Sequence, residues 1–178
     1  DRYNTAESDL KMALEMAGDK KDLHGPVINN LGRLAYNRGI YGEAHELYNQ
    51  SLAVYGAKIG IQNKATILNN LGTIFKAYGD TVSARIHYTK ALKLTEQSGN
   101  LNLKAKCFNN LGNYHRTLGE FKKGLNYLNR SLVIKEKNKD RKGIIATLTN
   151  IGYLHKDQGE VEKARLFFLR AKEEAEKL

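Results

Sequence analysis

A four-residue motif returns every forty residues and constrains the fold more than any other feature of this sequence. The motif NNLG occupies residues 29–32, 69–72 and 109–112, and TNIG occupies residues 149–152 at the same phase. A fixed period of about 20 to 50 residues is typical of stacked supersecondary units, each of which needs its neighbours to bury its apolar face. The sequence therefore predicts a solenoid of repeated units.

The second copy of the motif shows what one unit contains. Its apolar residues follow the spacing of a helix with one buried face: Ile67, Leu68, Leu71, Ile74, Phe75 and Tyr78. We call this helix A, and we expect it to end at Gly79, because glycine tolerates the left-handed conformation just past a helix end. The segment 81–97 carries a second apolar stripe, helix B, with Asp80 or Thr81 as its N-cap.

The glycine inside the motif lies in the middle of helix A, where glycine costs about 0.5 to 1 kcal/mol relative to alanine. Small residues follow twelve and nineteen positions after each glycine: Ala44, Ala84, Gly124 and Ala164, then Ser51, Ala91, Ser131 and Ala171. Small residues on both helices allow close approach of their backbones, so we interpret the glycine as a packing contact. A phosphate-binding glycine would belong to a GxGxxG or GxxxxGK motif after a strand, and neither motif occurs.

These residues resemble the tetratricopeptide repeat. Repeat two matches that family's pattern at Leu68, Leu71, Gly72, Phe75, Ala84, Tyr88 and Ala91, and repeat four at Leu148, Ile151, Gly152, Ala164, Phe168 and Ala171. Ala35, His115 and His155 depart from it at the aromatic position of helix A. The forty-residue period, against about thirty-four in the common form, is similar to that of the longer subclass found in kinesin light chains, Pins-type scaffolds and Rap-type bacterial regulators.

The resemblance implies an all-α fold, an α-solenoid in which antiparallel helix pairs stack into a right-handed superhelix. The expected divisions are a partial repeat of helix B and linker at residues 1–24, repeat 1 at 25–64, repeat 2 at 65–104, repeat 3 at 105–144 and repeat 4 at 145–178. The chain opens halfway through a repeat, and solenoids normally carry capping elements at their ends. We therefore expect a fragment of a longer protein.

The polar residues of helix A lie opposite its buried face on a helical wheel, where they line the concave surface of the stack. They form four columns: Asn29, Asn69, Asn109 and Thr149; Asn30, Asn70, Asn110 and Asn150; Arg33, Thr73, Asn113 and Tyr153; and Tyr36, Lys76, Arg116 and Lys156. A carboxamide both donates and accepts, so the asparagines match the N–H and C=O groups of a bound peptide. The basic fourth column selects acidic side chains, because arginine forks onto carboxylates.

The asparagines have a structural alternative, in which their amides link adjacent repeats. This alternative is stronger for the column that begins with Asn30, and the column that begins with Asn29 is the better candidate for partner contact. The resemblance implies contact with ligand peptides at these positions. Charge is not needed for stacking, so the basic residues of the fourth column are the better determinants of partner choice.

The net charge of +10 is concentrated in the third repeat, where residues 105–144 hold ten Lys and Arg against three Asp and Glu. The cluster comprises Lys122, Lys123, Arg130, Lys135, Lys137, Lys139, Arg141 and Lys142. It is interpreted as a solvated face, or alternatively as a patch for RNA, DNA or an acidic protein. Phe121 and Tyr127 are expected to be partly packed, so no row of exposed aromatic residues for stacking bases is evident.

Catalytic and metal sites are not expected. Cys107 has apolar neighbours and is interpreted as a core thiol, and His115 and His155 are interpreted as packed aromatic residues that face helix B. No HExxH, CxxC or GxSxG motif occurs. The sequence therefore predicts no enzyme activity, no metal and no cofactor.

The longest uncharged run, residues 143–155, is thirteen residues long, short of the roughly 20 apolar residues that a membrane span needs. We expect no membrane association and a cytoplasmic location. The leading hypothesis is a scaffold whose concave groove binds an extended or helical, acidic peptide segment, as the sensor or regulatory module of a larger protein. The alternatives are nucleic-acid binding through the third repeat and regulation of an enzyme domain in the same chain.

Overall fold

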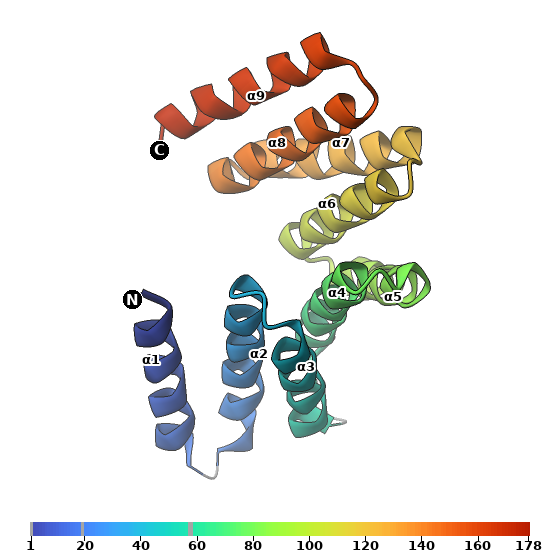
Figure 1. Cartoon of the computed structure of the whole chain (residues 1–178). Coiled ribbons are helices and arrows are strands. Elements are labelled where there is room, and N and C mark those ends of the chain that lie inside the picture. The colour runs from blue at the N-terminus through green and yellow to red at the C-terminus, as the bar shows by residue number, and fades with distance from the viewer. Residues whose placement is uncertain (1, 19, 57–58) are drawn as a thin grey trace. The chain divides into compact units, whose positions relative to one another are not determined.

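The computed structural model describes residues 2–18, 20–56 and 59–178, and within these ranges every regular element is a helix (Figure 1). Asp1 and the predicted linker residues Asp19, Ala57 and Lys58 lie outside this description. In chain order the helices are α1 (Arg2–Ala17), α2 (Lys21–Asn37), α3 (Tyr41–Tyr55), α4 (Ile61–Ala77), α5 (Thr81–Ser98), α6 (Leu101–Thr117), α7 (Phe121–Lys137), α8 (Arg141–Asp157) and α9 (Val161–Glu176). The even-numbered helices are the A helices of repeats 1–4, and α3, α5, α7 and α9 are the B helices. The predicted all-α architecture of helix pairs is confirmed.

The helices group into two units, residues 1–94 and 95–178, with the boundary inside α5. In the first unit α2 packs on α1 and α3, and α4 packs on α3; in the second, α7 packs on α6 and α8, and α9 packs on α8. Successive A helices also touch, α2 with α4 and α6 with α8. We call the surface formed by each of these two pairs the A-helix face of its unit.

The turn between helices A and B has the predicted form. Gly79 has a φ of 78°, in the left-handed region, and the Asp80 N–H donates to the Phe75 carbonyl oxygen at 2.9 Å, which closes the last turn of α4. The Asp80 Oδ1 accepts from the Ser83 N–H at 2.9 Å, so Asp80 rather than Thr81 caps helix B. Gly39, Gly119 and Gly159 stand at the same phase as Gly79 in the other repeats and share this left-handed φ.

The glycine of the repeated motif is a packing contact, as predicted, but its closest neighbour is the large residue sixteen positions later. A Cβ atom at Gly72 would lie 2.7 Å from a ring carbon of Tyr88, and one at Gly152 would lie 2.6 Å from Phe168. The small residues twelve positions later are buried as expected, Ala84 at 0% exposure. The missing Cβ therefore makes room mainly for an aromatic ring of helix B.

The core of each unit is built from the predicted apolar stripes. Ile67 and Leu71 belong to one buried cluster in the first unit, and Leu148 and Ile151 belong to another in the second. Cys107 is fully buried, and burial raises the pKa of its thiol to about 12. The interpretation of Cys107 as a core thiol is confirmed by its burial, and the raised pKa disfavours the thiolate that reactivity needs.

One turn between a helix B and the next helix A holds a non-glycine residue in the left-handed region. Lys139, between α7 and α8, has a φ of 54°, and Gly99 occupies the same position forty residues earlier with a φ of 67°. A residue with a Cβ atom is disfavoured in this region by about 1–2 kcal/mol. The turn before α8 therefore holds a strained lysine where the turn before α6 holds a relaxed glycine.

Lys139→Gly is expected to raise the free energy of unfolding by about 1 kcal/mol, because it relieves this backbone strain. Lys142→Gly, inside α8, is the matched control and should lower it by about 0.5–1 kcal/mol. Chemical denaturation measures both. A loss of stability in both variants would show that the left-handed turn carries no strain.

Candidate functional site

The paired asparagines link successive A helices. In the first unit the Asn70 Nδ2 donates to the Asn29 Oδ1 at 3.2 Å, and in the second the Asn150 Nδ2 donates to the Asn109 Oδ1 at 3.0 Å. Each bond joins the second asparagine of one repeat to the first asparagine of the repeat before it. The predicted structural role of the second column is confirmed for Asn70 and Asn150, and the first column supplies the acceptors.

The asparagines differ in how much surface they retain. Asn69 is only 5% exposed, so it has little surface to offer a ligand. Asn29, Asn30, Asn109 and Asn110 are half-buried on the A-helix faces of their units. Thr149, the last member of the first column, is also half-buried, and its hydroxyl donates to the Ile145 carbonyl oxygen at 2.8 Å. Surface for contact with a partner therefore remains at the three half-buried members of the first column, Asn29, Asn109 and Thr149.

The third column is mixed in character. Arg33 is exposed on α2, and Tyr153 is 44% exposed on α8. Thr73 is half-buried, and its Oγ1 accepts from the Tyr88 hydroxyl at 3.3 Å, which ties it to helix B. Asn113 is half-buried on α6. Arg33 and Tyr153 thus offer the largest free side-chain surface in this column.

The fourth column is less uniformly basic than its sequence indicates. Tyr36 and Lys76 are half-buried, and Lys156 is exposed. The Arg116 Nη1 lies 2.8 Å from the Asp157 Oδ2, so a carboxylate of the next A helix already compensates much of this charge. Sequence reasoning missed Asp157, although it stands one position beyond the forty-residue equivalent of Arg116.

Two polar atoms on α6 lack hydrogen-bond partners in the described residues. The Asn113 Oδ1 and the Arg116 Nε are buried, and neither has a partner in the described part of the chain. The two residues are three apart, so they lie on the same face of the helix. A buried polar atom without a partner is costly, and here an acceptor and a donor belong to residues about one helical turn apart on α6.

A buried lysine extends the asparagine link into the interior of the second unit. The Lys135 Nζ lies 2.8 Å from the Thr147 Oγ1, which in turn lies 3.3 Å from the Asn109 Oδ1. Lys135 is only 6% exposed, and burial lowers the pKa of its ammonium group to about 8. The expectation that Lys135 belongs to the exposed basic cluster of the third repeat is therefore wrong.

Other members of that basic cluster also have local partners. The Arg130 guanidinium carbon lies 4.1 Å from the ring centroid of Phe108, and the Lys123 Nζ lies 3.0 Å from the Glu120 Oε1. The remaining cations are exposed, among them Lys122 and Lys137. The cluster is thus a mixture of packed, paired and solvated side chains.

The two histidines at the aromatic position of helix A are packed rings, as predicted. His115 stacks on Tyr127 with ring centroids 5.3 Å apart and an interplanar angle of 5°, and His155 stacks on Phe167 at 5.3 Å and 14°. In the described ranges no group of three or more His, Cys, Asp and Glu residues is arranged to hold a metal ion.

Each histidine also bonds a glutamate of the following turn, which sequence reasoning missed. The His155 Nδ1 lies 2.6 Å from the Glu160 Oε2, and His115 makes the same contact with Glu120. Hydrogen bonds, first from Lys123 and then from His115, hold the pKa of Glu120 below its usual value. These contacts fasten the turn between helices A and B and are structural.

Stacked helix pairs with a polar A-helix face define an α-solenoid scaffold for protein interaction, whose partners are proteins or peptides. Residues 27–62 match one tetratricopeptide-repeat profile and residues 103–177 match another, together more than half of the chain. The chain belongs to the tetratricopeptide-repeat family. Proteins of this family are in general non-catalytic scaffolds. No curated protein matches the chain, and no helix in the described residues is long and apolar enough to cross a membrane.

Several solved structures share the fold. The chain is 26% identical to BtubC (BKLC) from P. vanneervenii, with a TM-score of 0.74 over 98% of this chain and 73% of that one. It is 15% identical to aspartyl phosphate phosphatase F from Bacillus subtilis, with a TM-score of 0.78 over 98% of this chain and 45% of that one. TPR-like repeats assigned to a Podosopora anserina kinesin light chain are 13% identical, with a TM-score of 0.65 over 98% of this chain and 85% of that one. The last two likenesses concern the fold alone.

Proposed function

We propose that the A-helix faces bind an extended or helical acidic peptide segment of a partner protein. The carrying observation is the pair of unsatisfied buried atoms on α6, the Asn113 Oδ1 and the Arg116 Nε. A peptide unit offers one N–H donor and one C=O acceptor, the groups that match this acceptor and this donor. The proposed groove residues are Asn29, Arg33, Tyr36, Thr73 and Lys76 in the first unit, and Asn109, Asn113, Arg116, Tyr153 and Lys156 in the second.

The acidic character of the proposed ligand follows from charge. The second unit holds seventeen Lys and Arg against ten Asp and Glu, which attracts anionic partners and raises their association rate. Lys156 is exposed and has no ion-pair partner in the described residues, whereas Arg116 is held by Asp157. Lys156 is therefore the stronger determinant of the two.

An exposed aromatic ring adds apolar surface beside these groups. Tyr153 is 44% exposed, its ring is packed edge-on against Phe168 at 5.3 Å, and the Arg116 guanidinium carbon lies 5.6 Å from its centroid. A ring held in this way offers contact area at little cost in conformational entropy. Arg116, Tyr153 and Lys156 thus combine charge with one fixed aromatic surface.

Lys156→Glu is expected to weaken binding of a fluorescein-labelled peptide of alternating Glu and small residues about tenfold, because a like charge replaces a cation. Asn113→Ala should weaken it several-fold, since a backbone N–H loses its acceptor. Fluorescence anisotropy measures both affinities, and circular dichroism checks the helix content.

Lys137→Glu is the matched control, because it makes the same charge change at an exposed position on α7. If Lys156→Glu and Lys137→Glu lose the same amount of peptide affinity, the effect comes from net charge alone. That result would contradict binding in the proposed groove. Preference for a single-stranded RNA over the acidic peptide, lost in Lys137→Glu, would favour the nucleic-acid alternative instead.

A further inference from the structure

A cleft of about 430 Å³ lies between the end of α6 and the first half of α7 and shares no residue with the proposed groove. Every side chain that lines it carries a hydrogen-bond donor, and none of them is a carboxylate: His115, Lys122, Lys123, Asn126, Tyr127 and Arg130. The Oε1 atom of Glu120, just before α7, lies 3.0 Å from the Lys123 Nζ, so this lysine is already paired. The cations that remain for a ligand are Lys122 and Arg130.

Packed rings hold two of these donors in place. The Tyr127 ring stacks on His115 with an interplanar angle of 5°, and its centroid lies 5.9 Å from that of Phe108. The Arg130 guanidinium carbon lies 4.1 Å from the ring centroid of Phe108, which is buried. A guanidinium that lies on a ring keeps the N–H groups of its edge for an anion. Arg130 and Tyr127 therefore present their donors with little conformational entropy left to lose.

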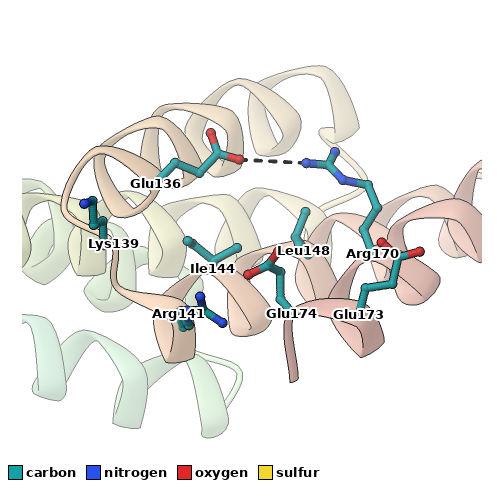
Figure 2. A pocket seen from close by; sticks show the side chains of 8 residues that line it. All are labelled: Glu136, Lys139, Arg141, Ile144, Leu148, Arg170, Glu173 and Glu174. Atoms are coloured by element: carbon teal, nitrogen blue, oxygen red, sulfur yellow. Dashed lines mark ion pairs between the residues drawn. The ribbon is translucent and has the colours of Figure 1, made fainter. Parts of the chain in front are cut away.

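Arg130 has no carboxylate partner, in contrast to the equivalent arginine of repeat four. Figure 2 shows Glu136 facing Arg170, and the Arg170 Nη2 lies 3.8 Å from the Glu136 Oε1. Forty residues before Glu136 stands Glu96, whose Oε1 lies 3.5 Å from the Lys104 Nζ instead. Among the described residues the Arg130 guanidinium therefore has ring contacts but neither an ion pair nor a hydrogen bond.

Three further donors of the cleft are also available to a ligand. Lys122 is exposed and forms no ion pair within the described ranges, and the Tyr127 hydroxyl forms no hydrogen bond there. The His115 Nδ1 lies 2.5 Å from the Glu120 Oε2, and its Nε2 has no partner in the same part of the chain. A histidine with a carboxylate on one ring nitrogen can hold a proton on the other as well and donate it to an anion.

This set of donors is confined to repeat three. Repeat four holds a carboxylate and two apolar side chains at three of the equivalent positions: Glu162, Leu166 and Phe167. Its arginine, Arg170, is the one that Glu136 neutralises. A nucleic acid binds through several phosphate contacts along its backbone, and α9 does not continue such a row. One localised group of donors fits one localised anion.

We propose that this cleft binds the phosphate group of a phosphorylated side chain of a partner protein. A phosphate monoester carries a charge of about −1.5 to −2 and three strong acceptor oxygens, so it matches two unpaired cations and several donors better than a carboxylate does. The Arg130 guanidinium forks onto two of its oxygens, and Lys122 and the Tyr127 hydroxyl supply further contacts. A cleft of about 430 Å³ has room for the phosphate together with the side chain that carries it.

Short peptides without other charges test the proposal. Capped Gly-Ala-Ser-Ala-Gly, with phosphoserine, phosphotyrosine, serine or glutamate at its centre, is titrated into the ¹⁵N-labelled chain and followed in ¹H–¹⁵N spectra. At least one phosphopeptide should bind about tenfold more tightly than the glutamate peptide, because its charge and its number of acceptors are larger. The serine peptide should not bind measurably. The amide resonances of residues 115 and 122–130 should shift on binding.

Arg130→Gln should weaken the tighter phosphopeptide about tenfold, because it removes hydrogen bonds to a charged group. Tyr127→Phe removes one hydroxyl, at a position where repeat four carries Phe167, and should weaken it roughly 2- to 10-fold. Arg170→Gln is the matched control. It makes the same change at the equivalent position of repeat four, where Glu136 already neutralises the arginine, and should leave the affinity unchanged. Circular dichroism verifies that all three variants are folded.

Phosphopeptides that bind no more tightly than the glutamate peptide would overturn the proposal, as would equal effects of Arg130→Gln and Arg170→Gln. Inorganic phosphate that binds as tightly as the phosphopeptide would assign the cleft to a free anion. Tighter binding of a uridine oligonucleotide, lost in Arg130→Gln, would assign it to nucleic acid. Either result contradicts a phosphorylated partner protein. Lys156→Glu changes no residue of the cleft and should leave the phosphopeptide unaffected, so failure of the groove and failure of the cleft are measured separately.

Discussion

Replacing Gly72 with valine is expected to lower the free energy of unfolding by about 3 kcal/mol. A Cβ atom at this position would lie 2.7 Å from a ring carbon of Tyr88, whose side chain is fully buried and has no room to withdraw. The two further methyl groups of valine increase the overlap, and the helix propensity gained on losing glycine is too small to offset it. Urea denaturation followed by circular dichroism measures the change.

Gly42→Ala is the control for this experiment. Gly42 also lies in a helix of the first unit, but a Cβ atom there would have the Tyr78 hydroxyl oxygen as its nearest neighbour, at 3.9 Å. This variant should stay within about 0.5 kcal/mol of the parent. Equal stability of Gly72→Val and Gly42→Ala would mean that the motif glycine is not a close-packing residue.

Lys135→Met is expected to raise the free energy of unfolding by about 2 kcal/mol at pH 7, because it removes a buried ammonium group. Burial lowers the pKa of Lys135 from 10.5 to about 8, partly opposed by Asp140. Below pH 8 the lysine is charged in both states, and the cost of burying the charge is fully present. Thr147 keeps a partner in the variant, since its hydroxyl also donates to the Gly143 carbonyl oxygen at 2.9 Å.

The stability of the parent protein should depend on pH because the pKa of Lys135 differs between the folded and unfolded states. Between pH 8 and 10.5 the folded protein has released the Lys135 proton while the unfolded chain still holds it. The parent therefore gains stability as the pH rises, by on the order of 3 kcal/mol across this window. Lys135→Met should lack that gain, and Lys137→Met, at an exposed position of the same helix, should retain it. Parallel stability curves for the two variants would contradict the assignment.

The fold was predictable because the repeat supplies four readings of the same pattern. The spacing of Ile67, Leu71 and Ile74 defined helix A, and Gly79 marked its end. The role of Gly72 as a packing contact was also predictable, since a mid-helix glycine needs a compensating contact. Its partner Tyr88 was not identified, because small residues were expected to oppose a small residue, whereas the helix uses the gap for a ring.

The candidate site was predicted less completely. Charged residues were interpreted one at a time, without comparing them with the residues at equivalent positions of the other repeats. Lys135 was grouped with its basic neighbours, although Tyr55 and Thr95 at the equivalent positions indicate an inward-facing column. Asp157 was missed for the same reason, since its pairing with Arg116 crosses from one repeat to the next.

The hydrogen bonds between asparagines also affect how the number of repeats can change during evolution. The donor and the acceptor of each bond stand in different copies of the repeat, as in Asn70 with Asn29 and Asn150 with Asn109. Duplication of a forty-residue segment that carries both asparagines therefore supplies a donor and an acceptor together. The second asparagine of the new copy donates to the first asparagine of the copy before it. The first asparagine of the new copy accepts from the second asparagine of the copy after it. Repeat number can change by whole units without leaving an amide unpaired at the new junction.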